Sequence, residues 1–412
     1  MKTLFYIEPH PIRNSLVGFR SVAQRYLPLI FSVPYGHEVR MFANRATYST
    51  IDGDVRLHFD KLLSTSIKEE SYLEQNLKSW DSNGCKEWVD LMEGKGKHCD
   101  FQINLLNRLY RSFQFDAIVH WGENGAITKF VEDKPITRVA MELGCSRNPF
   151  FNSIVMDPYG TNGSALLTKL GIEDIRTAVN NTQLSAEEAR FGYTPSSFSK
   201  EFEDLRKVTK NVKKIAFLPL QVFDDANLLR FSKYNKLSEV VLDIVPKLSD
   251  KGYVTIIKPH PSSKYRPGSF QENAIARKAL DPWNKSIIWC NEETRITNPE
   301  FYSLSDIVVT VNSSVGFEAL YFDKTVTVLG DAVYKPKDVF PSLEESMSGN
   351  FDHKKYLDHI GLIRQFVLNG YLQNHALCTN PRAFFQKLKW VDQAWKNSNG
   401  IPSKYIQEFY NK

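Results

Sequence analysis

The amino-acid sequence predicts an α/β fold made of two Rossmann-like halves. Short apolar segments, rich in β-branched residues, alternate with helical patterns along both halves. That alternation is typical of parallel sheets covered by helices on both faces. At 412 residues the chain exceeds what one hydrophobic core usually serves, which favours two domains. With 42% hydrophobic and 24% charged residues, it has the composition of an ordinary folded protein.

The strands are predicted from runs that are apolar throughout, which indicates burial on both faces of a sheet. We expect them at residues 4–7, 39–42, 117–120 and 137–141 in the first half, and at 214–218, 254–257, 287–289, 307–311 and 326–329 in the second.

Three other stretches define the domain organisation. Residues 54–113 carry amphipathic, charged patterns and are interpreted as a helical insertion in the first half. The polar, basic stretch 196–212 is expected to link the halves. Helical segments near 352–369 and 381–396 end the pattern, and we expect them to pack back on the first half. The predicted domains are an N-terminal acceptor lobe at 1–205, a C-terminal nucleotide-binding lobe at 206–350 and terminal helices at 351–412.

Charge and cysteine usage narrow the function classes. A formal net charge of +5 suits anionic ligands or loose attraction to an acidic membrane surface, and it does not favour nucleic acid. The five cysteines are scattered and lack CxxC spacing, which indicates neither a disulfide framework nor a zinc site. The first apolar run meets Glu8 too early for a signal peptide, and no run is long enough to span a membrane. We therefore expect a cytoplasmic protein.

Two strand ends in the second half carry groups suited to a nucleotide phosphate. Lys-Pro-His-Pro at 258–261 follows one strand, and Asn-Ser-Ser-Val-Gly-Phe-Glu at 312–318 follows another. Parallel strands bring their carboxyl ends to one edge of the sheet, where open α/β sheets bind ligands. The flanking prolines hold His260 on a stiff turn, from which its imidazole can donate to a phosphate oxygen. Alone, such a turn would more often be structural; the second segment favours the phosphate site, with Lys258 beside it.

The second segment also predicts a helix that begins with hydroxyl side chains. Ser313 and Ser314 can cap it, and its free N–H groups favour a phosphate. Gly316 lets the backbone approach a ligand. Glu318 has two open interpretations: an acceptor for ribose hydroxyls, or a first-turn carboxylate that favours the helix dipole.

Carboxylates follow one strand in each half. Gln221, Asp224 and Asp225 come after the first strand of the second half, and Glu142 ends the last predicted strand of the first half. One carboxylate from each half is what glycosyl transfer with retention needs: a nucleophile, and an acid/base near the attacking oxygen. Acidic residues after strands are often only turn formers or caps, so that alternative stays open.

These motifs together carry a family resemblance. Leu-Pro-Leu-Gln-Val-x-x-Asp at 218–225, then Lys-Pro-His-Pro at 258–261, then Asn-Ser-Ser-Val-Gly-Phe-Glu-Ala-Leu at 312–320 resembles the bacterial capsule and O-antigen polysaccharide Kdo transferases, which are retaining β-Kdo glycosyltransferases. Weaker similarity extends back through Glu142 and residues 154–157. The resemblance implies a GT-B-like fold, with two Rossmann-like lobes that face a central cleft. The absence of a G-x-G-x-x-G fingerprint agrees with it.

The resemblance further implies CMP-Kdo as the donor, with His260, Ser313 and Ser314 binding the CMP phosphate. It implies that Kdo moves to a glycan acceptor of capsule or lipopolysaccharide O-antigen. The expected partners are therefore a CMP-sugar and a lipid-linked glycan, with peripheral contact at the inner face of the inner membrane. No nucleic-acid partner is expected.

By the same resemblance, Asp225 is the nucleophile that forms a glycosyl-enzyme adduct and Glu142 is the acid/base. Asp224 is the second candidate for the nucleophile, and Gln221 supports the donor site. The segment from Leu143 to Arg147 departs from the family's acidic-Gly-Arg-Ser pattern, which weakens the assignment of Glu142.

We expect no metal and no cofactor besides the CMP-Kdo substrate. No DxD-type motif is placed to bind magnesium, and the monophosphate that leaves can be neutralised by His260 and a helix N-terminus. The carboxylate of the donor sugar needs basic or hydroxyl partners. Arg147, Lys258 and Lys335 are candidates by position, although such side chains are more often solvated surface charges.

Two alternatives stay open for the function. One is a CMP-releasing transferase of the glycerophosphate or sialic-acid type; the glycerophosphate type also resembles a strand with a Pro-His-Pro turn and a later Ser-Ser turn. The glycerophosphate family usually has Asp-Tyr where Val311 and Asn312 stand here. A non-catalytic module for nucleotides or glycans would keep the phosphate site without turnover.

Two strand ends of the first half are candidates for acceptor binding. Residues 8–15 repeat the Pro-His-Pro arrangement, for which a structural turn is the favoured interpretation. Trp121 ends another strand and offers either an aromatic platform for a sugar or a core side chain.

Overall fold

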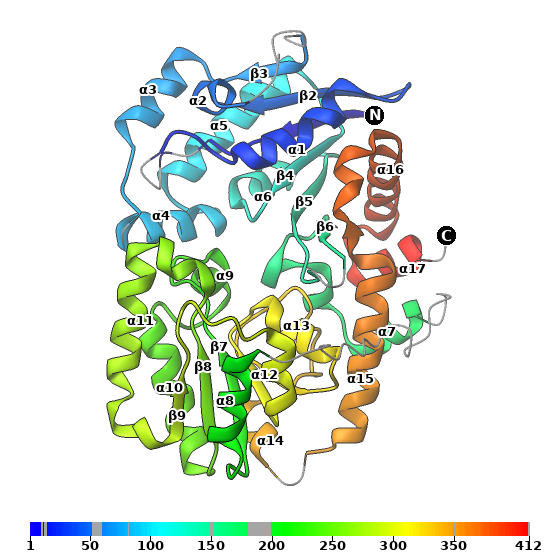
Figure 1. Cartoon of the computed structure of the whole chain (residues 1–412). Helices are drawn as coiled ribbons and strands as arrows, with labels where there is room; N and C mark the ends of the chain where they lie inside the picture. The colour runs from blue at the N-terminus through cyan, green and yellow to red at the C-terminus, as the bar shows by residue number, and fades with distance from the viewer. Residues whose placement is uncertain are drawn as a thin grey trace. The chain divides into compact units, whose positions relative to one another are not determined.

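The computed structural model divides the chain into two compact units, Met1–Thr161 with Leu372–Lys412, and Asn162–Tyr371 (Figure 1). Each is an α/β unit built on one sheet, which confirms the predicted fold class. The described residues are 1–9, 11, 15–51, 60–80, 82–147, 151–179, 199–348 and 351–410.

The first unit contains a seven-stranded sheet with the order β12-β6-β5-β4-β1-β2-β3. The strands β1 to β5 pair in parallel, whereas β6 is antiparallel to both of its neighbours. The bounds are β1 (Lys2–Tyr6), β2 (Glu38–Ala43), β3 (Leu62–Ser64), β4 (Ala117–Trp121), β5 (Thr137–Leu143), β6 (Ser153–Asp157) and β12 (Gln373–Asn374).

Helices cover both faces of this sheet. On one face, α1 and α16 pack against Phe5 and Val119, and on the other, α5 and α6 pack against Leu4 and Ile118. Because α16 contributes Leu388 to this core, it belongs to the first unit. The bounds are α1 (Arg20–Phe31), α2 (Arg45–Ser49), α3 (Ile67–Gln75), α4 (Ser82–Met92), α5 (Gly96–Ser112), α6 (Gly125–Val131), η7 (His375–Thr379), α16 (Pro381–Ser398) and α17 (Pro402–Tyr410).

The second unit contains a five-stranded sheet, parallel throughout, with the order β11-β10-β7-β8-β9. All five strands were predicted. Their bounds are β7 (Ile215–Pro219), β8 (Val254–Lys258), β9 (Ile287–Trp289), β10 (Ile307–Thr310) and β11 (Thr325–Val328).

The helices of the second unit also lie on both faces of its sheet. The helix α10 packs on Leu218, Ile257 and Val309, while Phe217 on the opposite face stacks on Phe301 of α12 at 4.7 Å between ring centroids. The bounds are η2 (Asn162–Ser164), η3 (Leu166–Lys169), α7 (Ile172–Val179), α8 (Lys200–Thr209), α9 (Ala226–Phe231), α10 (Leu237–Asp250), η4 (Pro261–Tyr265), α11 (Pro267–Ala279), η5 (Asp281–Ser286), α12 (Asn298–Leu304), α13 (Ser314–Leu320), α14 (Leu343–Met347), α15 (His353–Phe366) and η6 (Val367–Tyr371).

The stretch predicted as a linker contains a helix. The side chain of Ser199 caps α8 by accepting a hydrogen bond from the backbone N–H of Phe202. Phe202, Leu205 and Thr209 are buried at helical spacing, so this helix packs on the second unit. The prediction missed it because charged residues surround these few apolar positions. Residues 196–198 lie outside the described part of the chain.

The predicted insertion at 54–113 holds helices α3, α4 and α5 but also the strand β3. Leu62 and Leu63 were assigned to a helical pattern, yet they pair with β2 at the edge of the sheet. Residues 54–59 lie outside the described ranges. The domain boundaries predicted after 205 and after 350 both fall within the second unit, as does α15.

No helix among the described residues is both long and apolar enough to cross a membrane. All five cysteines are buried, and none of them belongs to a disulfide.

The packing of α16 predicts that Leu388→Ala will destabilise the first unit by about 2–5 kcal/mol, because Leu388 is fully buried and its truncation leaves a cavity. Urea unfolding followed by tryptophan fluorescence measures the loss. The neighbouring, exposed Lys389→Ala is the matched control and should leave stability within about 0.5 kcal/mol. Equal effects of the two variants would contradict this packing.

Candidate functional site

The second sheet has a topological switch point between β7 and β10. These strands are neighbours, but α10, which follows β7, packs on one face. The helix α13, which follows β10, is joined to α12 on the other face, where the Tyr302 hydroxyl donates to the carbonyl of Val315. Figure 1 shows α10 on one side of the sheet and α12 and α13 on the other. Ligands of open α/β sheets bind outside the carboxyl ends of the strands at such a point.

Gln221 joins the two strand ends at this switch point. Its side-chain oxygen accepts a hydrogen bond from the backbone N–H of Asn312 at 3.2 Å. Because that oxygen must face a donor, the amide nitrogen faces the other way and donates to Asp225 Oδ2 at 3.4 Å. The side chain is buried, so these bonds are protected from water. The predicted support residue therefore ties the Asp225 loop to the Ser313 loop.

The two adjacent aspartates have different surroundings. Asp224 accepts a hydrogen bond from Arg266 at 2.7 Å and forms an ion pair with it. Asp225 contacts Gln221 instead, and its negative charge acts on the imidazole of His260. Only Asp225 is therefore tied to the other predicted site residues. The two predicted candidates thus differ in their partners, Arg266 for Asp224 and Gln221 for Asp225.

His260 has a defined neutral tautomer. Its Nδ1 accepts a hydrogen bond from the backbone N–H of Ser262 at 3.1 Å. Nδ1 therefore carries no proton, and the proton of the neutral ring is on Nε2. Burial lowers the pKa of His260, and the Asp225 carboxylate opposes that shift. At neutral pH the ring is thus an uncharged donor through Nε2, the form that the predicted phosphate contact needs.

Lys258 and Glu318 are joined through an asparagine that was not predicted. Lys258 Nζ donates to Asn298 Oδ1 at 2.9 Å, and Asn298 Nδ2 donates to Glu318 Oε2 at 2.9 Å. The Tyr302 hydroxyl also donates to that oxygen at 3.4 Å. Burial lowers the pKa of Lys258, while the Cys290 thiol and Glu318 raise it. Both predicted nucleotide-binding groups therefore make contacts inside the unit, and Glu318 joins α13 to α12.

The turn before α13 is held by its own backbone and by one tyrosine. Ser313 Oγ accepts from the N–H of Val315 at 3.3 Å, and the Gly316 N–H donates to the carbonyl of Ser313 at 3.0 Å. Two of the N–H groups predicted to be free are thus already bonded. The Tyr334 hydroxyl donates to the same carbonyl at 2.6 Å.

Gly316 has a packing role that differs from the predicted approach to a ligand. A Cβ at this position would collide with the Tyr334 hydroxyl and with the Thr310 methyl group. Its backbone dihedral φ is not positive, so only space requires glycine here. The close fit of α13 against Tyr334 positions the hydroxyls of Ser313 and Ser314, which are both partly exposed.

The remaining predicted residues lie elsewhere. Glu142, in β5, and Arg147 belong to the first unit. Glu142 Oε1 accepts from the N–H of Leu143 at 2.8 Å. Arg147 donates to the carbonyls of Gly144 and Ser146. Lys335 donates to two carbonyls, of Val328 and Gly330, at 2.9 Å each, which makes it a structural cation.

Four residues that position the site were not predicted: Arg266, Asn298, Asn312 and Tyr334. Asn312 is the first residue of the 312–318 motif, so the sequence could have indicated its position at the site. Asn298 lies 40 residues from Lys258, and Arg266 lies 42 from Asp224, so neither pairing leaves a local pattern.

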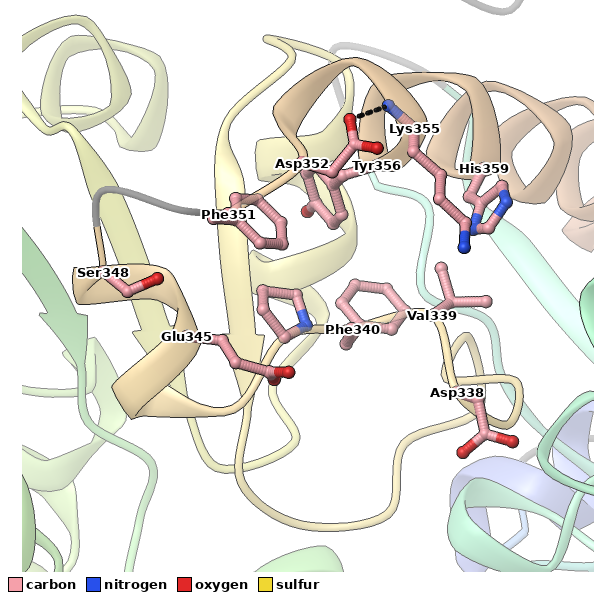
Figure 2. A pocket seen from close by; sticks show the side chains of 11 residues that line it. Asp338, Val339, Phe340, Glu345, Ser348, Phe351, Asp352, Lys355, Tyr356 and His359 are labelled. Carbon is pink, nitrogen blue, oxygen red and sulfur yellow. Dashed lines mark hydrogen bonds between the residues drawn. The ribbon is translucent and has the colours of Figure 1, made fainter.

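A pocket of ≈460 Å³ lies at another place in the second unit. Figure 2 shows the Lys355 and His359 side chains of α15 close together on one side of it, with Phe340 and Phe351 nearby. None of the predicted site residues lines this pocket.

The family model that matches this chain lies within the second unit. The model of the capsule polysaccharide biosynthesis protein family matches residues 175–339, which include every predicted site residue of that unit. The resemblance to capsule polysaccharide proteins is confirmed. A curated relative, the capsule polysaccharide export protein KpsS of Escherichia coli, is 28% identical over 126 residues. The match spans 29% of this chain and 30% of that protein.

Solved structures resemble the chain more distantly. Two are from Thermosulfurimonas dismutans KpsC: a β-Kdo 2,7 transferase with 19% identity and a TM-score of 0.42, and a β-Kdo 2,4 transferase with 16% and 0.33. The match to the 2,7 transferase covers 69% of this chain and 90% of the transferase chain. The match to the 2,4 transferase covers 60% of this chain and 79% of the transferase chain. A UDP-GlcNAc 2-epimerase from Neisseria meningitidis has 12% identity and a TM-score of 0.32, with 94% and 99% covered. Likenesses of this size assign no residue.

The surroundings of His260 predict a titration midpoint below 6.5 and a proton on Nε2 at pH 7, because burial disfavours the imidazolium and Nδ1 is an acceptor. Nitrogen NMR of the histidine-labelled protein, assigned with His260→Gln, measures both. A midpoint above 6.5, or a proton on Nδ1 at pH 7, would contradict this description.

Proposed function

We propose that this protein is a retaining glycosyltransferase that moves Kdo from CMP-Kdo to a glycan of capsule or lipopolysaccharide O-antigen. The observation that carries the proposal is the bridge made by Gln221. It brings the Asp225 loop and the Ser313 loop together at the switch point, within electrostatic reach of His260. The matched capsule family, which covers this part of the chain, supports it.

The phosphate of CMP would lie at the carboxyl ends of β7, β8 and β10. His260 Nε2–H is a neutral donor to a phosphate oxygen, and the hydroxyls of Ser313 and Ser314 add two more donors. As the bond to the sugar breaks, negative charge grows on this phosphate, and the three donors stabilise it. The proposed reaction needs no metal and no cofactor, because a monophosphate is already a good leaving group.

Two displacements would complete the reaction. In the first, the Asp225 carboxylate attacks the anomeric carbon of Kdo, the bond to the phosphate breaks, and CMP leaves with the bonding electrons. In the second, an acceptor hydroxyl attacks the same carbon, its proton passes to Glu142, and Asp225 is released. Two inversions give net retention. Asp224 is a poorer nucleophile, because Arg266 already holds it in an ion pair.

The proposed partners follow from this chemistry. They are a CMP-sugar donor and a lipid-linked glycan acceptor, reached by peripheral contact with the inner face of the inner membrane. A cytoplasmic location is part of the proposal, because CMP-activated sugars are used there.

We expect Asp225→Asn to lower Kdo transfer by at least about 1,000-fold, because an amide cannot serve as the nucleophile. CMP affinity should stay unchanged. Asp224→Asn is the matched control and should lose less than about tenfold, since it only breaks a partly exposed ion pair. The measurements are CMP release with a glycan acceptor, and calorimetry with CMP. Intact mass of Glu142→Gln after mixing with CMP-Kdo should show one added sugar.

Equal activity of the Asp225 and Asp224 variants would remove Asp225 from the mechanism. CMP binding without turnover of CMP-Kdo by the unaltered protein would favour a binding module. Turnover of another CMP-linked substrate instead would favour the glycerophosphate or sialic-acid type of transfer.

The phosphate contacts predict that His260→Gln will weaken CMP binding by about tenfold, because one hydrogen bond to a charged group is lost. Calorimetry with CMP and with cytidine separates a lost phosphate contact from a general loss of binding. Cytidine lacks the phosphate, so it should bind the unaltered protein and His260→Gln equally. His359→Gln, in the pocket of Figure 2, is the control with normal affinity. A similar loss for cytidine would show that His260 does not contact the phosphate.

A further inference from the structure

An arginine in the first unit lies over the ring of a tryptophan at the end of a strand. The guanidinium carbon of Arg25, in α1, is 4.9 Å from the ring centroid of Trp121, the last residue of β4. That is the distance of a cation–π contact. Trp121 is only 7% exposed, so its covered ring is not the open platform for a sugar that the sequence allowed.

Arg25 is half-buried, yet it has no hydrogen bond or ion pair to any described residue. A guanidinium carries five N–H donors, and no described residue accepts a hydrogen bond from those of Arg25. The guanidinium therefore keeps N–H donors that can make a two-pronged contact with an oxyanion. This combination is typical of an arginine whose partner is a ligand.

The predicted acid/base lies in the same cluster. Trp121 pairs with Met141, the residue before Glu142, and the Gly122 N–H donates to the carbonyl of Met141 at 2.8 Å. Glu142 Oε2 is 3.8 Å from the position of a Cβ on Gly122. The Tyr26 hydroxyl, next to Arg25 in α1, contacts Met141 Sδ at 3.8 Å. The guanidinium and the carboxylate thus lie next to two consecutive residues, Trp121 and Gly122.

The charges of this cluster also act on shared neighbours. Burial raises the pKa of Tyr26, Glu142 raises it further, and Arg25 lowers it. Both Arg25 and Glu142 are therefore within electrostatic reach of one phenol, in agreement with the geometry.

The cluster is at the switch point of the first sheet. The strands β1 and β4 are neighbours, but α1, which follows β1, covers one face, and α6, which follows β4, covers the other. The crevice outside their carboxyl ends is where an open α/β sheet takes a ligand. Trp121 ends β4, so Arg25 faces this position.

We propose that Arg25 binds an oxyanion of the acceptor, a carboxylate or a phosphate, and so selects acceptors that are charged close to the attacking hydroxyl. This rests on the proposed function, in which Glu142 takes the proton of that hydroxyl. The anion pairs with the guanidinium edge while the hydroxyl points to Glu142. Trp121 holds the guanidinium by its cation–π contact and is a positioning residue. The anion belongs either to an acidic sugar or to a phosphate that joins the glycan to its lipid.

Binding without the donor tests this separately from catalysis. The probes are glucuronate, glucose 6-phosphate and neutral glucose, measured by calorimetry with the unaltered protein, Arg25→Gln and Arg25→Lys. We expect Arg25→Gln to weaken the preferred anionic probe by about 100-fold and leave glucose unchanged. Arg25→Lys should lose about tenfold, because an ammonium keeps the charge without the two-pronged contact. The exposed Arg382→Gln, in α16, is the control with no effect.

The probe whose affinity falls more in Arg25→Gln identifies the source of the anion: glucuronate indicates a sugar carboxylate, and glucose 6-phosphate indicates a phosphate. Unaltered protein that binds neither anion more tightly than glucose would overturn the proposal, as would equal losses for glucose and the anions. Failure of CMP-Kdo turnover with an intact, Arg25-dependent anion preference would refute the transferase and leave the anion site standing. With turnover, Arg25→Gln should lower kcat/KM for anionic acceptors alone, at unchanged CMP affinity.

Discussion

The buried amide of Gln221 is the interaction on which the candidate site depends. It satisfies a backbone N–H of the loop after β10 and a carboxylate oxygen of the loop after β7, and its two ends cannot be exchanged without losing both bonds. A buried amide with only one bond would cost on the order of 1–3 kcal/mol, so the two loops are held in one relative position. Ser313 and Asp225 therefore keep their places because Gln221 spans the switch point.

A second set of contacts supports the same edge of the sheet from the face of α12 and α13. Asn298 accepts a hydrogen bond from the ammonium of Lys258 and donates one to the carboxylate of Glu318. These two bonds join β8 to α13. Tyr334 holds the carbonyl of Ser313 and requires glycine at position 316. Lys258, Glu318, Asn298 and Tyr334 thus stabilise the fold of this edge. The groups suited to chemistry are the His260 ring, the serine hydroxyls and Asp225.

The strands that form the sheet of the second unit were predictable, since each is a short run of mainly apolar residues. The strands β3, β6 and β12 were not predicted: Leu62 and Leu63 of β3 were assigned to a helical pattern, and β12 has only two residues. The site was predictable where a strand end carries a motif, as at His260 and Ser313. The roles of Glu318 and Gly316 were not, because they depend on Asn298 and Tyr334, which only the fold brings near. The same holds for Arg25, whose partner Trp121 comes from a distant strand.

The central claim is that the phosphate of CMP binds at the switch point between β7 and β10. A crystal structure with CMP tests it most directly. The account predicts phosphate oxygens within hydrogen-bond distance of His260 Nε2 and of the Ser313 and Ser314 hydroxyls, with Asp225 on the side of the departing sugar. A phosphate bound elsewhere, for instance between Lys355 and His359 in the pocket of Figure 2, would contradict it.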